Sequence, residues 1–329
     1  MSLQELAARA AVPALPGELS VLRGRPLLAV DLRDRPADTD DVASLVQPLA
    51  RLPLVLAGVG ATGSDDPATL EPFDVVVASP DELDPIRAAV ERNPQASVTL
   101  VQLLRLSVQL PPLDALVAES FAYATLQGGA ELAAWLATRG SRVRKPQAEP
   151  SVLVARHDDV LHVELNRPRL HNLYDAAMRD ALADALTIAL ADPSIAKVSL
   201  RGRGKSFCAG GDLAEFGTVS DPTTAHLIRS SANPGPLLVA LADRLEVHVH
   251  GAAVGAGCEL AAFAARVVAT PDATFRLPEG SMGLVPGAGG TVSVTRRIGR
   301  QRAAWLMLTG ETIDATTAHA WGLVDEIAR

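Results

Sequence analysis

The sequence contains few cysteines and few lysines. It has only two cysteines, Cys208 and Cys258, which are too few for a disulfide framework. We therefore expect a reducing compartment, the cytoplasm, with both thiols buried as small apolar side chains. Only three lysines occur, no basic run stands out, and the formal net charge is −8. This balance argues against nucleic acid or an anionic membrane surface as a partner.

Long apolar runs and nucleotide-binding signatures are also missing. No run approaches the roughly 20 apolar residues that span a bilayer, so no membrane partner is expected. The opening MSLQELAARAAVPALPG lacks a basic region followed by an apolar one, so we expect no signal peptide. There is no GxxxxGK[ST] motif. GVGATG at 58–63 leads into a polar, turn-rich segment and not a helix, so dinucleotide binding is not expected.

A charged, proline-containing stretch divides the chain. SRVRKPQAEPS at 141–151 lacks hydrophobic periodicity and is interpreted as a linker between residues 1–140 and 152–329. In the second part, strand and helix patterns alternate, which is typical of an α/β domain. The expected elements are a hairpin at 151–168 turning at Asp158-Asp159, a helix at 175–192, strands at 196–202 and 245–251, a helix at 296–310 ended by Gly310, and a last helix capped by Asp314.

The first part has its own α/β pattern. Strands are expected at 26–36, 53–60 and 73–79, with a helix at 40–52 that Pro48 should bend. From 85 to 140 the pattern is helical, broken at Pro111-Pro112. In both parts a strand, a helix and a second strand that runs into glycines follow one another. This weak repeat suggests a duplication, although unrelated strand–helix–strand units also resemble one another.

Two glycine-rich loops are the strongest local signal. GKSFCAGGDLAEF (204–216) and GAAVGAGCEL (251–260) each follow a predicted strand and precede a predicted helix. Backbone N–H groups at a helix N-terminus are unpaired and carry partial positive charge, so they favour anions. Two such groups that converge would suit a thioester oxygen that gains negative charge as an enolate forms.

Two glutamates accompany these loops. Glu259 lies in the first helical turn after the second loop, and Glu279 lies in a segment rich in proline and glycine. Paired carboxyl groups beside an oxyanion hole could act as base and acid. Taken singly, Glu259 could merely complement the helix dipole and Glu279 could be an exposed loop acid. His248 and His250 share one face of a strand, where we expect structural roles and no metal site.

The motifs SFCAGGDL, GAAVGAGCELA, FRLPEGSMGLVPGAGGTVSVTRRIG and LTGETIDATTAHAWGLVDEI follow one another across about 165–328. Together they resemble the enoyl-CoA hydratase/isomerase, or crotonase, superfamily. The resemblance implies an α/β spiral of ββα units that binds an acyl-CoA thioester, with no cofactor beyond the coenzyme A of the substrate. It also implies a homo-oligomer, a trimer or hexamer.

By position, the resemblance makes Gly211 and Ala256 the oxyanion N–H donors. Glu259 would hold water and help to deprotonate it, and Glu279 would deliver a proton to the α-carbon. The position that often carries lysine in the family is Ala214. A basic group would then serve the coenzyme A phosphates instead, from Arg167, Arg169, Arg203 or Lys205. The further substrate-binding residues implied are Ala209, Gly210, Asp212, Leu213, Gly255, Gly280, Arg167 and Arg169.

The segment 85–140 is similar to the helices that normally close the crotonase fold, which the sequence lacks after about 328. We therefore predict a tandem origin. In this hypothesis, 1–140 is a truncated crotonase-like α/β segment whose helices cover an active site, its own or a neighbour's, with FAYATLQGG (121–129) at the pocket. An unrelated helical appendage is the alternative. Residues 217–235 are too irregular to place and are expected to be a mobile wall near the acyl group.

The chemistry also has alternatives. Having both glutamates favours addition of water across a 2-enoyl-CoA. The same oxyanion hole could instead serve double-bond isomerisation, thioester hydrolysis or decarboxylation. A non-catalytic subunit that binds acyl-CoA is the alternative from a different functional class.

Overall fold

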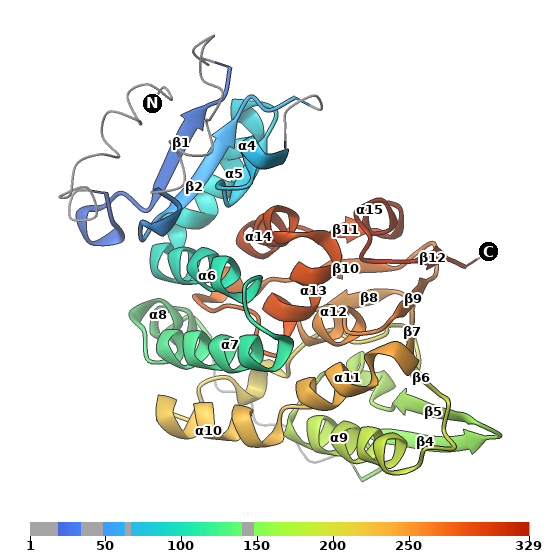
Figure 1. Ribbon diagram of the computed structural model, residues 1–329. Helices are drawn as coiled ribbons and strands as arrows, with labels where there is room; N and C mark the ends of the chain where they lie inside the picture. The colour runs from blue at the N-terminus through green and yellow to red at the C-terminus, as the bar shows by residue number, and fades with distance from the viewer. Residues whose placement is uncertain (1–18, 34–48, 63–66, 140–147, 329) are drawn as a thin grey trace.

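The computed structural model describes residues 19–33, 49–62, 67–139 and 148–328, and these form three sheets with helices packed between and around them (Figure 1). The largest sheet has the order β12-β9-β7-β6-β5-β4. Its strands are β4 (Val152–His157), β5 (Val160–Leu165), β6 (Lys197–Gly202), β7 (Leu245–Val249), β9 (Arg266–Ala269) and β12 (Glu326–Ile327).

The first two strands of this sheet form the predicted hairpin. β4 and β5 pair antiparallel, and Asp158 turns the chain with a φ of 53°. The other neighbours pair parallel, so their carboxyl ends lie at one edge of the sheet. The glycine-rich loops follow β6 and β7 at that edge. α9 (Ala176–Ala191) packs on the hairpin strands and is capped by Asp175, whose carboxylate accepts from the Met178 N–H.

A second sheet lies beside the glycine-rich loops. β11 (Ile313–Asp314), β10 (Thr274–Arg276) and β8 (Ala252–Val254) form it in that order. Around it lie α12 (Ala256–Ala261), η6 (Glu279–Met282), α13 (Gly290–Ile298), α14 (Arg300–Thr309) and α15 (Ala315–Trp321). The Asp314 cap on α15 is confirmed, since its carboxylate accepts from the Thr317 N–H.

The single helix predicted at 296–310 is wrong. Gly299, with a φ of 81°, separates α13 from α14. A left-handed backbone at this residue stops the α13 hydrogen-bond ladder and lets α14 leave in a new direction. Gly310 does end α14, as predicted.

The N-terminal sheet is parallel, with the order β1-β2-β3. Its strands are β1 (Leu27–Asp31), β2 (Val55–Val59) and β3 (Val75–Val77), accompanied by η1 (Val21–Arg23), η2 (Leu49–Arg51) and α4 (Pro67–Leu70). β1 is shorter than the strand predicted at 26–36. Most of the helix predicted at 40–52, with Pro48, lies outside the described residues, and its end at 49–51 is a 3-10 turn.

Four helices follow this sheet: α5 (Pro80–Arg92), α6 (Pro94–Ser107), α7 (Pro112–Gln127) and α8 (Ala130–Ala137). The helical pattern and its break at the Pro111-Pro112 pair are confirmed. Figure 1 shows α6 and α7 beside α13, with α7 also lying along α10 (Pro222–Ala232). α10 lies within 217–235, the stretch judged too irregular to place, and α11 (Gly235–Leu241) begins at its last residue. The Asp221 carboxylate caps α10 by accepting from the Thr224 N–H.

A continuous apolar core joins the two parts of the chain. Buried residues of β2, β3 and the four helices form one cluster with those of the large sheet and of α12 to α15. A buried carboxylate reinforces the junction. Asp74 is 1% exposed and accepts from the Leu56 N–H, from Arg105 and from Arg300 Nη1. Among the described residues, no helix is both long and apolar enough to cross a bilayer.

Candidate active site

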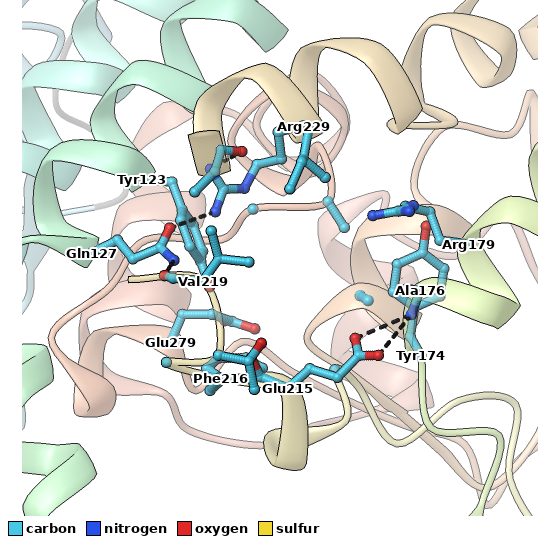
Figure 2. A pocket seen from close by; sticks show the side chains of 18 of the residues that line it. Tyr123, Gln127, Tyr174, Ala176, Arg179, Glu215, Phe216, Val219, Arg229 and Glu279 are labelled. Carbon is cyan, nitrogen blue, oxygen red and sulfur yellow. Dashed lines mark hydrogen bonds between the residues drawn. The ribbon is translucent and has the colours of Figure 1, made fainter. Parts of the chain in front are cut away.

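A cavity of about 400 Å³ lies where the carboxyl edge of the large sheet meets the N-terminal helices. Figure 2 shows side chains around it, with Tyr123, Gln127 and Arg229 on one wall and Tyr174 and Arg179 on the opposite wall. Its lining includes Gly211, Ala256, Glu259 and Glu279. The cavity therefore brings together the four residues to which the resemblance assigns the chemistry.

The two glycine-rich loops are held together by backbone hydrogen bonds. The Cys208 N–H donates to Ala252 O at 3.1 Å, and the Val254 N–H donates to Cys208 O at 2.9 Å. A Cβ on Gly257 would lie 2.4 Å from Cys208 O, so only glycine permits this approach. Both cysteines are buried, as predicted, and burial raises the pKa of Cys208 to about 12. The contact fixes one loop relative to the other.

The two predicted oxyanion donors are unused within the described part of the chain. Gly211 lies between two backbone bonds, Tyr174 N–H to Gly210 O and Asp212 N–H to Tyr174 O, both 2.8 Å long. Its own N–H has no acceptor among the described residues. Ala256 is the first residue of α12, so its N–H has no helical acceptor. Two N–H donors without acceptors therefore border the cavity.

Glu259 has a well-organised environment. It extends from α12, is 2% exposed, and its Oε2 accepts from the N–H groups of Ala288 and Gly290 at 2.7 and 2.8 Å. A Cβ on Gly290 would lie 2.6 Å from Glu259 Cγ, so the glycine admits this side chain. Burial raises the pKa of Glu259 to about 7, against the opposing effect of the two N–H groups.

The Glu279 carboxyl group is less well satisfied by hydrogen bonds than that of Glu259. Glu279 is the first residue of η6, is 8% exposed, and its Oε2 has no hydrogen-bond partner among the described residues. Burial, and then the nearby Glu259 carboxylate, raise the pKa of Glu279 well above its ordinary value. Because Glu259 receives two N–H donors, it ionises more readily. The arrangement therefore favours an ionised Glu259 beside a protonated Glu279.

A third glutamate, which the sequence analysis missed, stands behind this pair. Glu119 of α7 is 1% exposed and accepts from the Gly289 N–H at 2.8 Å, the Thr291 N–H at 3.0 Å and the Thr291 hydroxyl at 2.6 Å. Burial, followed by repulsion from Glu259, raises the pKa of Glu119 to about 8. A single acid within the apolar sequence ALVAESFA was the signal available for it.

The arginines predicted to bind coenzyme A do not line the cavity. Arg167 is 4% exposed, and its Nη1 contacts an Asp175 oxygen at 2.7 Å and donates to Leu173 O at 2.7 Å. These partners make it a buried brace of the loop, contrary to the expected phosphate contact. Arg169 is exposed on η3 (Pro168–Leu170).

The other predicted substrate-binding residues support the loops. Asp212 is buried and caps η4 (Leu213–Glu215) by accepting from the Ala214 N–H. Gly255 bends the backbone with a φ of 48°, and a Cβ there would lie 2.5 Å from Glu279 Oε1. The cavity lining includes none of the six residues of this group, which are Ala209, Gly210, Asp212, Leu213, Gly255 and Gly280.

The two strand histidines have partners outside the cavity. His248 Nε2 lies 2.8 Å from Glu246 Oε1, and His250 Nε2 lies 3.0 Å from Gly204 O.

The N-terminal helices and α10 complete the cavity. Tyr123 and Gln127 of α7, from the segment expected at the pocket, line it together with Leu132 of α8. From α10 come Ala225, Ile228 and Arg229, so part of the unplaced segment is indeed a wall of the cavity. α7 and α10 are joined by a hydrogen bond between Ser120 Oγ and His226 Nδ1 at 2.8 Å.

Known proteins share this second part of the chain. Residues 155–329 match the family described as Enoyl-CoA hydratase/isomerase. The chain is 37% identical over 182 residues to the 2,3-dehydroadipyl-CoA hydratase of Escherichia coli, covering 54% of this chain and 68% of that protein.

Solved structures give the same result. The enoyl-CoA hydratase of Thermoplasma volcanium matches with a TM-score of 0.50 and 32% identity, over 55% of this chain and 72% of that one. The enoyl-CoA hydratase of Bacillus anthracis matches with a TM-score of 0.50 and 29% identity, over 54% and 70%. With a sequence match over residues 155–329 and the same α/β fold in solved relatives, the chain belongs to the enoyl-CoA hydratase/isomerase family, the crotonases.

Proposed function

We propose that this chain adds water across the double bond of a 2-enoyl-CoA thioester. The observation that carries the proposal is the pair of buried glutamates on one cavity. Glu259 Oε2 accepts from the Ala288 and Gly290 N–H groups, whereas Glu279 Oε2 has no partner among the described residues. Two carboxyl groups in opposite protonation states provide a base and an acid at once. Both lie beside the unused N–H groups of Gly211 and Ala256.

In the proposed reaction, the thioester oxygen lies between the Gly211 and Ala256 N–H groups. The ionised Glu259 takes a proton from water while the water oxygen bonds to C3 of the acyl group. The double-bond electrons move toward the thioester, and the enolate oxygen is held by the two N–H donors. Glu279 then donates its proton to C2. Water is thereby divided between C3 and C2, and proton exchange restores the two glutamates.

We propose that α7 and α8 close this site within the same chain, in the place of the closing helices of the family. The hydrogen bonds of Glu119 of α7 to Gly289 and Thr291, and the Leu132 side chain of α8 at the cavity, support this role. We retain the tandem origin of residues 1–140, with 141–151 as linker, as a hypothesis, and a homo-oligomer, a cytoplasmic location and the lack of a further cofactor as predictions.

The test is consumption of the conjugated enoyl thioester, followed by its absorbance, for a series of 2-enoyl-CoAs. Glu279→Gln should lower kcat by about 10²- to 10⁴-fold while acyl-CoA binding persists. Glu164→Gln is the control, because Glu164 pairs with Arg201 on the large sheet and not in the cavity. Equal rates for wild type and Glu279→Gln would overturn the proposal.

Product mass separates hydration from isomerisation by the same residues. A hydrated product is heavier than its substrate by one water, whereas an isomer has the same mass. Binding of acyl-CoA without turnover by the wild type would favour the non-catalytic subunit.

A further inference from the structure

The cavity contains a cation with no counter-ion among the described residues. Arg229 is half-buried on α10, and no Asp or Glu side chain in the described part of the chain forms an ion pair with it. Arg179, on the opposite wall, differs in that its Nη2 lies 2.7 Å from Asp180 Oδ1. Partial removal of an arginine from water without a compensating anion is unfavourable. In keeping with this, burial lowers the pKa of Arg229.

The Arg229 guanidinium is held in a fixed orientation. Gln127 Nε2 donates to Val219 O at 3.0 Å, which leaves its Oε1 to accept from Arg229 Nη2 at 3.0 Å. The guanidinium carbon lies 3.9 Å from the centroid of the Tyr123 ring (Figure 2). Arg229 also hydrogen-bonds the Tyr123 side chain, and its Nη1 donates to Ala225 O at 3.4 Å. A guanidinium has five N–H donors, so some remain for a ligand.

Two of the three carboxyl groups that line the cavity, those of Glu215 and Glu259, have other partners, and the third, Glu279, is the protonated acid of the proposed reaction. Glu215 accepts from the Ala176 N–H at 3.1 Å, at the start of α9. Glu259 accepts from the 288–291 segment. The Tyr123 ring, which packs on Arg229, also packs on Gly287 just before that segment. A Cβ added to Gly287 would lie 2.5 Å from the Tyr123 ring. Arg229 thus shares the cavity with the reacting pair but lies against the α7 and α10 wall.

We propose that Arg229 binds a carboxylate at the distal end of the acyl group, so that the preferred substrate is a 2-enoyl-CoA derived from a dicarboxylic acid. A carboxylate matches the planar fork of a guanidinium and supplies the missing negative charge. The Tyr123 ring and Gln127 position the fork. A methyl-ended acyl chain would leave the half-buried cation without a compensating charge. This inference rests on the proposed function for its substrate, but the binding preference it predicts does not require turnover.

The experiment compares pairs of 2-enoyl-CoAs of equal chain length that end in a methyl group or in a carboxylate. For the wild type, kcat/KM should be at least about tenfold higher with the carboxylate. Arg229→Gln should lower that value by about 10- to 100-fold and change the methyl-ended value by less than about threefold, which reverses or abolishes the preference. Arg229→Lys should keep part of it, since a lysine retains charge but not the fork.

Arg179→Gln is the matched control. It removes the other arginine of the cavity, whose charge Asp180 already balances, so both substrates should respond to the same degree. A wild type without preference, or an Arg229→Gln variant that affects both substrates equally, would overturn the inference.

Calorimetric binding of the saturated carboxylate- and methyl-ended acyl-CoAs separates this inference from the proposed function. If nothing is turned over but the wild type binds the carboxylate-ended thioester more tightly and Arg229→Gln does not, the inference stands and hydration fails. If hydration is observed without any preference in either assay, hydration stands and the inference fails.

Discussion

Glu119 and Glu259 divide four consecutive backbone N–H groups between them. Those of Ala288 and Gly290 donate to Glu259, and those of Gly289 and Thr291 donate to Glu119. The chain bends at Gly289, whose φ is 105°, and enters α13 at Gly290, so successive N–H groups face different sides. Residues 288–291 are therefore held on both sides, by Glu259 of the candidate active site and by Glu119 of α7.

This arrangement predicts that Glu119 is a positioning residue. Glu119→Ala leaves the Gly289 and Thr291 donors unpaired, so the free energy of unfolding should fall by at least about 2 kcal/mol. The loosened segment should also hold Glu259 less well, which lowers kcat by about tenfold with little change in KM. Denaturant unfolding and steady-state kinetics measure the two effects.

A merely structural role for Glu119 would not alter the acidity of Glu259. With weaker N–H donors, the pKa of Glu259 should rise, so the acid side of the pH–rate profile of Glu119→Ala should move to higher pH. Asp74→Asn serves as comparison, because it weakens a buried junction away from the cavity and should leave that profile in place. Coincident profiles for wild type and Glu119→Ala would contradict the positioning role.

The wild-type pH dependence follows from the two active-site glutamates. Glu259 must be ionised, and its pKa is raised to about 7, so kcat/KM should rise as the pH increases through about 7. Glu279 must be protonated, and its pKa is raised well above the ordinary value, so activity should fall again at higher pH. The two limbs belong to the coupled pair. A rate that climbs without a falling limb would argue against Glu279 as the acid.

Gly255→Ala tests the oxyanion hole. An added Cβ would lie 2.5 Å from Glu279 Oε1 at a residue with a φ of 48°, so the turn that presents the Ala256 N–H must shift. We expect kcat to fall by about 10²-fold. Gly24→Ala is the matched control: its φ is 68° and nothing lies within 4 Å, so it should cost only about 1 kcal/mol of stability and no activity.

The Asp74 junction makes a separate prediction about stability. Asp74→Ala removes the carboxylate that pairs with Arg105 and Arg300 at a buried position. The free energy of unfolding should therefore fall by about 3–5 kcal/mol. Asp31→Ala in the same sheet should change little, since its pair with Arg33 is exposed. Urea unfolding of the two variants compares them, and similar losses would show that burial of Asp74 is not what matters.

Local patterns, together with the family resemblance, were enough to select four residues that line one cavity. Gly211, Ala256, Glu259 and Glu279 sit in loops whose glycines are required by close approaches, and such loops leave a clear mark in the sequence. Gly299 shows the limit of this reasoning. A helical pattern runs through it, and only its positive φ in the structure separates α13 from α14.

Glu119 and Arg229 could not be assigned in the same way. Their roles depend on partners far away along the chain: Glu119 contacts residues 170 and 172 positions later, and Arg229 contacts Gln127, 102 positions earlier. Hydrophobic periodicity gives no information about contacts between residues so far apart in the sequence. Arg167 differs, since its partner Asp175 lies only eight positions later; what the sequence does not show is that the arginine side chain is buried against it.

The separation of Glu119 and Thr291 also has a consequence for synthesis of the chain on the ribosome. At about 5–20 residues per second, the 172 positions between them take roughly 9 to 34 s to translate. During that interval α7 can form and pack on α6, but Glu119 lacks every one of its three donors. The Glu119 carboxyl group therefore acquires these donors only when residues 289–291 of the 329-residue chain have been synthesised.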